Sequence, residues 1–380
     1  MTATQPLYNL DKDKIDELYK HGAFLIVDDM PKGTEFGVDY ASWSTGPNFR
    51  GLKMIPPGLH FIFYSAVSKE GTVAPRTGFF YTFKEKEVRA ARNWVLYSPE
   101  TNFKFLKQSR QIVVKRYDVQ QETLVDSNVQ YQPKDIDKML APYPYQHYQR
   151  WCSLTTHITP TTVTRLQPQC TLIHAATPLL ANPRAEQDVA RATSVEDKLD
   201  ANFIQDDSQV MRFSKVDKKR ATVGYTAAQL TEYYMDTTSA LNSLIEQSGT
   251  EEELLGELQI SFVVFLLGHV YSAFEQWKLL VDTICRAQQS LVQRPNFYKA
   301  FIRTLHFHLK ETPSDFFVDI VSRNNFLVTT LKSLFEGLRE DEGVNSELRS
   351  RGEKFRTHLE KYYSWDFSYC EDDDPVVVET

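Results

Sequence analysis

Residues 251–285 read EEELLGELQISFVVFLLGHVYSAFEQWKLLVDTIC, and this stretch decides the fold of the C-terminal half. From Ile260 to Leu267 it is close to apolar all round. A helix without a polar face must be covered on every side, so it belongs at the centre of a helical domain. A membrane span needs about 20 apolar residues, and Glu257, Gln259 and His269 bracket a much shorter run. The sequence therefore predicts a buried helix, followed by a second helix with one apolar stripe.

Helical periodicity continues on both sides of this pair, with short loops between the segments. The triplet Glu251-Glu252-Glu253 suits the start of the central helix, because carboxylates are stabilised by the dipole at a helix N-terminus. We expect a compact all-α domain over residues 221–366. The other segments with helical periodicity are Thr226–Ile245, Asn296–Lys310, Pro313–Val321, Asn325–Leu338 and Asn345–Tyr363.

The N-terminal part reads differently, because short apolar and aromatic runs are separated by proline and glycine. Such runs are typical of strands in a sandwich or small barrel. We expect a β-rich, sandwich-like domain over residues 1–165, with flanking helices at Tyr145–Leu154 and from Thr159-Pro160 onward. The clearest predicted strands are Ala23–Val27, Gly51–Ile55, Leu59–Tyr64 and Gly78–Phe83.

Two further segments complete the predicted organisation. Residues 166–220 lose periodicity and are rich in Ala, Thr, Pro, Asp and Gln, which predicts a flexible linker. Residues 367–380 form an acidic and valine-rich tail. The predicted fold class is α+β multidomain, with a β-rich N-terminal domain and an all-α C-terminal domain.

Composition restricts the class of protein. The chain has 380 residues, 42% of them hydrophobic, and a formal charge of -7. The negative charge argues against a protein whose main function is to bind nucleic-acid phosphate backbones. The four cysteines, Cys152, Cys170, Cys285 and Cys370, stand far apart, which predicts neither a disulfide framework nor a zinc site. No secretory signal pattern opens the chain. We expect a soluble protein of the cytoplasm and nucleus.

Catalytic motifs are absent from the sequence, which contains no glycine-rich phosphate loop and no Gly-x-Ser-x-Gly elbow. His306 and His308 are two residues apart, so a helix would place them on different faces and they would not share a metal. Cys285 lies on an apolar helix face and is expected in the core. The sequence therefore predicts no enzyme, no cofactor and no metal.

Two basic segments leave alternatives open. Between residues 103 and 117, lysines and arginines alternate with Phe103, Phe105 and Tyr117. This mixture suits either single-stranded RNA or a solvated strand face with inward aromatics. The basic run from Arg212 to Arg220 suits a transport signal, a docking patch or a soluble linker. Ser208, Ser214 and Ser272 are candidates for phosphorylation by loop position or exposure alone.

The tail carries the sharpest local signal, since residues 371–380 read EDDDPVVVET. Three consecutive valines at a terminus favour pairing with the edge of a sheet. That sheet belongs either to a partner or to this chain's own β-rich domain. The candidate partner-binding residues are Pro375, Val376, Val377, Val378 and Glu379.

Several blocks together resemble the AAR-two splicing-factor family, most closely its animal members. Their order and spacing cover nearly the whole chain. The blocks are Met30–Gly37, Met54–Gly58, Pro142–Tyr145, Gly256–Gln259, Phe265–Gly268, Asp315–Ile320, Asn325–Leu327, Trp365–Phe367 and Pro375–Glu379.

The resemblance implies a β-rich N-terminal domain, a flexible linker and a superhelical C-terminal domain similar to VHS domains. It implies no enzymatic activity. Family members are assembly factors of the U-five snRNP. They bind the large scaffold protein Prp-eight through its RNase H-like and Jab/MPN-like domains. The surface that they cover is one that the helicase Brr-two and RNA also need. In the yeast member the tail joins a β-sheet shared by the two scaffold domains, a role that would fall here on Val376–Val378.

Overall fold

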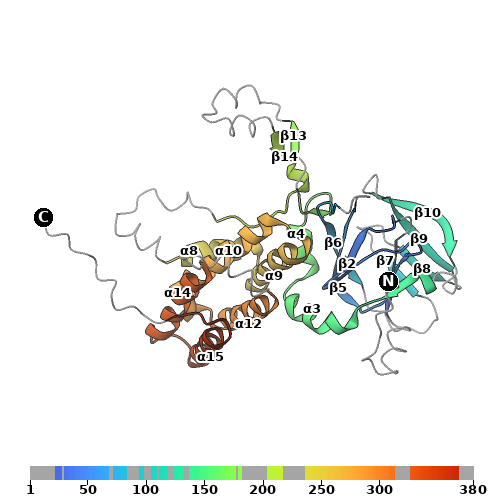
Figure 1. Ribbon diagram of the computed structural model, residues 1–380. Coiled ribbons are helices and arrows are strands. Elements are labelled where there is room, and N and C mark those ends of the chain that lie inside the picture. The colour runs from blue at the N-terminus through green and yellow to red at the C-terminus, as the bar shows by residue number, and fades with distance from the viewer. Residues whose placement is uncertain are drawn as a thin grey trace. The chain divides into compact units, whose positions relative to one another are not determined.

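The described part of the chain forms two compact units (Figure 1). The first contains residues up to Thr155, then Val163–Arg212 and Val263–Tyr271, and the second contains Thr156–Thr162, Phe213–Phe262 and the residues from Ser272 onward. The computed structural model describes residues 22–27, 30–67, 72–83, 94–97, 104–108, 111–118, 123–131, 137–176, 179–181, 203–216, 236–312 and 326–367.

The core of the first unit lies between two sheets. Apolar side chains from both sheets form a single buried cluster, in which Phe36 and Ile62 of one sheet meet Leu25 and Leu52 of the other. This arrangement agrees with the sandwich-like prediction. The smaller sheet has the order β1 (Ala23–Ile26), β4 (Gly51–Ile55), β11 (Leu140–Pro142), and the larger has the order β12 (Ile173–His174), β6 (Thr77–Phe83), β5 (Gly58–Ser65), β2 (Glu35–Val38), β3 (Ala41–Ser44).

Strand β5 is the centre of the larger sheet. It pairs antiparallel with β6, with Phe61 opposite Phe80, and with β2 on its other edge. Its residues from His60 to Ser65 are all buried, because both faces of the strand are covered. Gly58 opens the strand with a φ of 129°, a backbone conformation that side chains disfavour. Pro56 and Pro57 separate β4 from β5, so the predicted strands on either side of them are confirmed.

A further antiparallel sheet contains the basic segment singled out in the sequence. Its strand order is β10 (Thr123–Tyr131), β9 (Gln111–Asp118), β8 (Lys104–Gln108), β7 (Trp94–Tyr97). The backbone of the basic segment thus runs along β8 and β9, which are neighbours in this sheet.

The described part of residues 166–220 contains regular structure. Strand β12 adds to the larger sheet, and β13 (Leu179–Ala181) pairs with β14 (Phe203–Gln205). A short 3-10 helix follows at Asp207–Gln209. The flexibility expected of this linker stays a prediction.

The second unit is helical, as predicted. The apolar helix α9 is shared between the units, because its residues 251–262 belong to the second unit and its residues 263–268 belong to the first. Leu258, Val263 and Val264 of α9 have no exposed surface, and the polar residue Ser261 is equally buried. Among the described helices, none is both long enough and apolar enough to cross a bilayer. The described helices of the C-terminal part are α8 (Thr238–Ser248), α9 (Glu251–Gly268), α10 (Tyr271–Arg286), α11 (Gln288–Gln293), α12 (Pro295–Glu311), α14 (Phe326–Glu340) and α15 (Ser346–Tyr363).

Local capping explains where several helices begin. The Asn345 side chain accepts hydrogen bonds from the backbone N–H groups of Glu347 and Leu348 and so caps α15. Pro295 stands in the first turn of α12, where its missing N–H costs nothing. Two shorter helices, α3 (Tyr148–Leu154) and α4 (Pro160–Leu166), match the predicted flanking helices. The α+β fold class is confirmed.

Candidate protein-interaction site

The described chain ends at a fixed point on the helical unit. Helix α15 ends at Tyr363, and Ser364 then adopts a left-handed conformation with a φ of 55°. Trp365 stacks on Tyr363 with ring centroids 5.0 Å apart. Phe367 is 1% exposed and meets Phe335 of α14 edge to face at 5.0 Å. The predicted binding residues, Pro375 to Glu379, lie outside the described residues.

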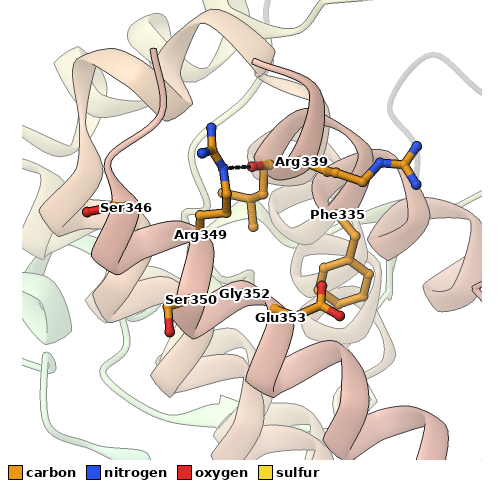
Figure 2. Close-up of a pocket in the computed structure, with 8 residues that line it drawn as sticks. Phe335, Arg339, Ser346, Arg349, Ser350, Gly352 and Glu353 are labelled. Carbon is orange, nitrogen blue, oxygen red and sulfur yellow. Dashed lines mark hydrogen bonds between the residues drawn. The ribbon is translucent and has the colours of Figure 1, made fainter. Parts of the chain in front are cut away.

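A groove opens between α14 and α15 (Figure 2), and Phe335, which Phe367 contacts, is one of its lining residues. Its volume is about 350 Å³, and its floor is formed by Phe335 and Leu338. Gly352 lets the two helices approach closely, because a Cβ there would stand 2.4 Å from Cδ1 of Leu338. The lining residues are Phe335, Leu338, Arg339, Ser346, Arg349, Ser350, Gly352 and Glu353.

Two arginines stand at the rim of this groove. The Arg349 guanidinium donates to the carbonyl oxygens of Leu338 at 3.0 Å and Asp341 at 2.8 Å, so it is held over the end of α14. Arg339 pairs with Glu340 at 3.0 Å on the exposed side. Glu353 is the acidic residue among the lining side chains. An apolar floor beside two guanidinium groups suits a peptide that carries both apolar and acidic side chains.

A second surface is formed by one face of α12 and α15. Six cations follow the i, i+3, i+4 spacing that places residues on one helix face. His306 of α12 and His358 of α15 join the two rows, with ring centroids 4.9 Å apart. Glu347 lies on the same face and pairs with Lys299 at 2.9 Å. The cations are Lys299, Arg303, Lys310, Arg351, Lys354 and Lys361.

This surface is distinct from the basic segments that stand out in the sequence, residues 103–117 and 212–220, and was not predicted. Its signal was present in the helical spacing of the cations, but only the packing of α12 beside α15 brings the two rows together. Burial lowers the pKa of His306, and the nearby His358 and Lys310 lower it further.

A buried Asp–His–Tyr cluster in the first unit has the residue types of a catalytic site. Nδ1 of His60 lies 2.7 Å from Oδ2 of Asp39, and the Tyr143 hydroxyl donates to the same oxygen at 2.6 Å. The backbone N–H of Phe61 donates to Oδ1 of Asp39 at 2.9 Å. Nε2 of His60 lies 2.9 Å from the carbonyl oxygen of Pro56. Asp39 and His60 have no exposed surface, so the cluster is built to connect strands.

Glu257 forms a second buried polar centre, in the helical unit. Its carboxylate accepts the backbone N–H and the hydroxyl of Ser214, at 2.8 and 2.7 Å, and Nε2 of Gln276 at 3.0 Å. These bonds fix the residues that lead into the helices. Ser214 is 6% exposed. The idea that Ser214 is an accessible phosphorylation site by loop position is therefore wrong, because its hydroxyl faces a buried carboxylate.

The predicted separation of the histidine pair is confirmed. His308 is fully buried, accepts from Nε1 of Trp277 at 3.1 Å, and stacks on Phe262 at 4.1 Å, whereas His306 is half-buried. Cys285 is buried in the core, as predicted. Within the described ranges, no group of three His, Cys, Asp or Glu side chains has the geometry to hold a metal ion.

Comparison with known proteins gives the family. The AAR2 N-terminal domain matches residues 21–168, and the AAR2 C-terminal repeat region matches residues 213–368. The chain is 36% identical to "Protein AAR2 homolog" of Mus musculus and to that of Homo sapiens, over 97% of this chain and 97% of each relative. The chain belongs to the AAR2 (AAR-two) family. A Caenorhabditis elegans AAR2 homolog is 34% identical over 94% of this chain and 98% of its own length.

The AAR2 matches also locate the structural features described above. The AAR2 C-terminal region begins at Phe213, next to the Ser214–Glu257 contact, and contains the whole α14/α15 groove. It ends one residue after Phe367. The valine tail therefore lies beyond the AAR2 repeat region.

Proposed function

We propose that this AAR2 family member is a non-enzymatic assembly factor in pre-mRNA splicing. It binds the scaffold protein Prp-eight, through the RNase H-like and Jab/MPN-like domains of that scaffold, during U-five snRNP and tri-snRNP biogenesis. While bound, it blocks premature binding of helicase and RNA. It acts in the cytoplasm and nucleus, without a cofactor and without a membrane partner.

The observation that carries this proposal is family membership over nearly the entire chain. Both AAR2 regions match in order, and the animal AAR2 homologs align over 97% of this chain. All of the resemblance blocks except Pro375–Glu379 lie within these two regions, which supports carrying the family's role to this chain.

The local chemistry supports a binding role. The Asp39–His60 and Glu257–Ser214 clusters are closed to solvent, and each carboxylate is occupied by donors from the chain itself. A general acid or base must reach a substrate. Among the described residues, the accessible features are instead a peptide-sized groove and a cationic helix face, which suit contact with another macromolecule.

A direct binding measurement tests the proposal. The full chain would be titrated calorimetrically with the recombinant RNase H-like domain and, separately, with the Jab/MPN-like domain of the scaffold. We expect saturable binding at micromolar concentrations or tighter. The proposal would be abandoned if neither domain, nor both together, bound at tens of micromolar.

A matched pair of variants tests the tail's part in that contact. Val377→Asp places a charge within the valine triplet, where a strand paired with a partner's sheet would bury it. Thr380→Asp adds the same charge at the chain end. We expect Val377→Asp to weaken scaffold binding at least tenfold, about 1.4 kcal/mol, and Thr380→Asp to have little effect. Equal effects would remove Pro375–Glu379 from the proposed interface.

The alternative is direct binding of single-stranded RNA through residues 103–117. The backbone places this segment on the adjacent strands β8 and β9, an arrangement that suits a nucleic-acid platform as well as an ordinary sheet. Titration with short single-stranded RNA at two salt concentrations distinguishes an RNA-binding sheet from an ordinary one. Tight, steeply salt-dependent binding that Lys107→Glu and Arg110→Glu abolish would favour RNA binding.

A further inference from the structure

We propose that the chain's own C-terminal tail, residues 368–380, docks into the groove between α14 and α15 when no partner is bound. The groove is the one described above, with Phe335 and Leu338 as its floor and Arg339 and Arg349 at its rim (Figure 2). In this proposal the tail occupies the groove in the free chain.

The first support is the point from which the tail departs. Phe367, the last described residue, is buried against Phe335. Phe335 is itself part of the groove floor. The tail therefore begins next to the groove, and its first residues have only a short distance to span in order to enter it.

The second support is reach. Glu371 to Asp374 follow Phe367 by four to seven residues, which an extended chain spans in about 13–23 Å. Arg339 lies one helical turn beyond Phe335, about 6 Å along α14. The acidic run can therefore lie beside the arginine rim without stretching the chain.

The third support is chemical complementarity. Glu371 to Asp374 supply four carboxylates. The guanidinium groups of Arg339 and Arg349 already bond to Glu340 and to two carbonyl oxygens, and the attraction proposed here is that of their positive charge for those carboxylates. Glu353 of the groove, with Glu340 and Asp341 at the end of α14, opposes this attraction. The acidic run is thus expected at the arginine end of the groove, away from Glu353.

The fourth support is the pattern of side chains along the tail. In an extended chain, alternate residues share a face. Phe367 faces the apolar floor, so Tyr369 would face it as well. Ser346 and Ser350 are the small side chains that α15 contributes to the groove lining, so little side-chain bulk stands on that side.

The docked tail has a consequence that rests on the proposed function. If the valine triplet pairs with a partner's sheet, then a groove-bound tail is withheld until a partner draws it out. Only chains with an undocked tail can bind that partner. The apparent affinity of the tail for the partner would therefore equal its intrinsic affinity multiplied by the undocked fraction.

Disulfide trapping in the full chain, without any partner, tests the proposal. The exposed Cys152 and Cys170 would be replaced by serine, which leaves Cys370 as the tail thiol and Cys285 buried. Ser350→Cys then places a thiol on the groove wall. Arg351→Cys is the matched control, because it is also exposed and adjacent in sequence but points about 100° further round the helix.

A docked tail raises the effective concentration of Cys370 at the groove. We expect Ser350→Cys to couple to Cys370 about tenfold faster than Arg351→Cys, as measured by mass spectrometry of time-resolved oxidation. High salt and the added substitution Arg339→Glu should both reduce this preference.

A second pair covers the distal tail, with Val376→Cys in a chain that also carries Cys370→Ser. If neither tail thiol prefers Ser350→Cys over Arg351→Cys, the tail does not dock in this groove. Because no scaffold is present, that result would leave the scaffold-binding proposal intact. Failure of the scaffold titration would likewise leave a positive trapping result standing.

Discussion

Ser214 gives both of its hydrogen-bond donors to one buried carboxylate, that of Glu257. The backbone N–H meets Oε1 at 2.8 Å and the hydroxyl meets Oε2 at 2.7 Å. Nε2 of Gln276 adds a donor to Oε1 and a second bond to the carbonyl oxygen of Ser214, both at 3.0 Å. The segment that leads into the helices is thereby tied to α9 and α10 at a site without solvent.

Ser214→Asp should therefore destabilise the helical unit. It sets a second carboxylate against Glu257, and an uncompensated buried charge costs about 3–5 kcal/mol. Ser214→Ala removes one donor and should cost about 1–2 kcal/mol. Urea unfolding gives both values, with the exposed Ser272→Asp as control. A Ser214→Asp protein as stable as that control would contradict the geometry.

Tyr143→Phe should weaken the first unit. The Tyr143 hydroxyl donates to the fully buried Asp39 at 2.6 Å, and losing a hydrogen bond to a charged group costs about 1.5–3 kcal/mol. The comparison is Tyr362→Phe, at a side chain that is 70% exposed. Thermal unfolding should show a lower Tm for Tyr143→Phe only. An unchanged Tm would mean that this bond contributes nothing to stability.

His308 should make stability depend on pH. Burial lowers the pKa of His308 from 6.5 to about 3. The folded protein thus holds the ring neutral, whereas the unfolded chain binds a proton near pH 6.5. This contribution is complete above pH 6.5 and declines as the pH falls toward 3, by about 2 kcal/mol between pH 7 and pH 5.

His308→Gln isolates that effect, because glutamine offers an acceptor to Trp277 but does not titrate. Urea unfolding at pH 7 and pH 5 should show a smaller loss for the variant than for the native chain. The difference between the two losses is assigned to His308, since the other histidines are common to both proteins. Equal losses would show that His308 is not held neutral.

Gly256→Ala should destabilise the protein, although alanine is the better helix former by about 1 kcal/mol. A Cβ at Gly256 would stand 2.5 Å from the carbonyl oxygen of His157, a backbone atom that must shift. Such overpacking costs about 1–3 kcal/mol. Gly46→Ala is the control, since nothing lies within 4 Å of its Cβ position. A stabilised Gly256→Ala would show that the contact is absent in solution.

Deletion of residues 375–380 should weaken scaffold binding while leaving Tm nearly unchanged. The valines serve a partner's sheet in this view and, in the free chain, only rest on an exposed groove, so the folded units lose little stability without them. Calorimetric titration and thermal unfolding of the same preparation give the two quantities. A large fall in Tm would assign the valines to this chain's own sheet instead.

Much of the architecture follows from local pattern. The apolar run Ile260–Leu267 predicts the buried α9, and the aromatic run Leu59–Tyr64 predicts β5. The family resemblance was also available from short blocks such as Trp365-Asp366-Phe367. The basic face of α12 and α15 was not predicted, because it requires two rows of cations from separate helices to lie side by side.

The sequence by itself determined which segments become strands and helices, because side-chain periodicity and turn residues act over a few neighbours. It also determined the family. Only the tertiary structure decided that Tyr143 meets Asp39, 104 positions away, that Ser214 meets Glu257, and that Phe367 meets Phe335 beside a groove. Those contacts depend on how whole elements pack, and the free energy of packing belongs to the assembled core rather than to any single segment.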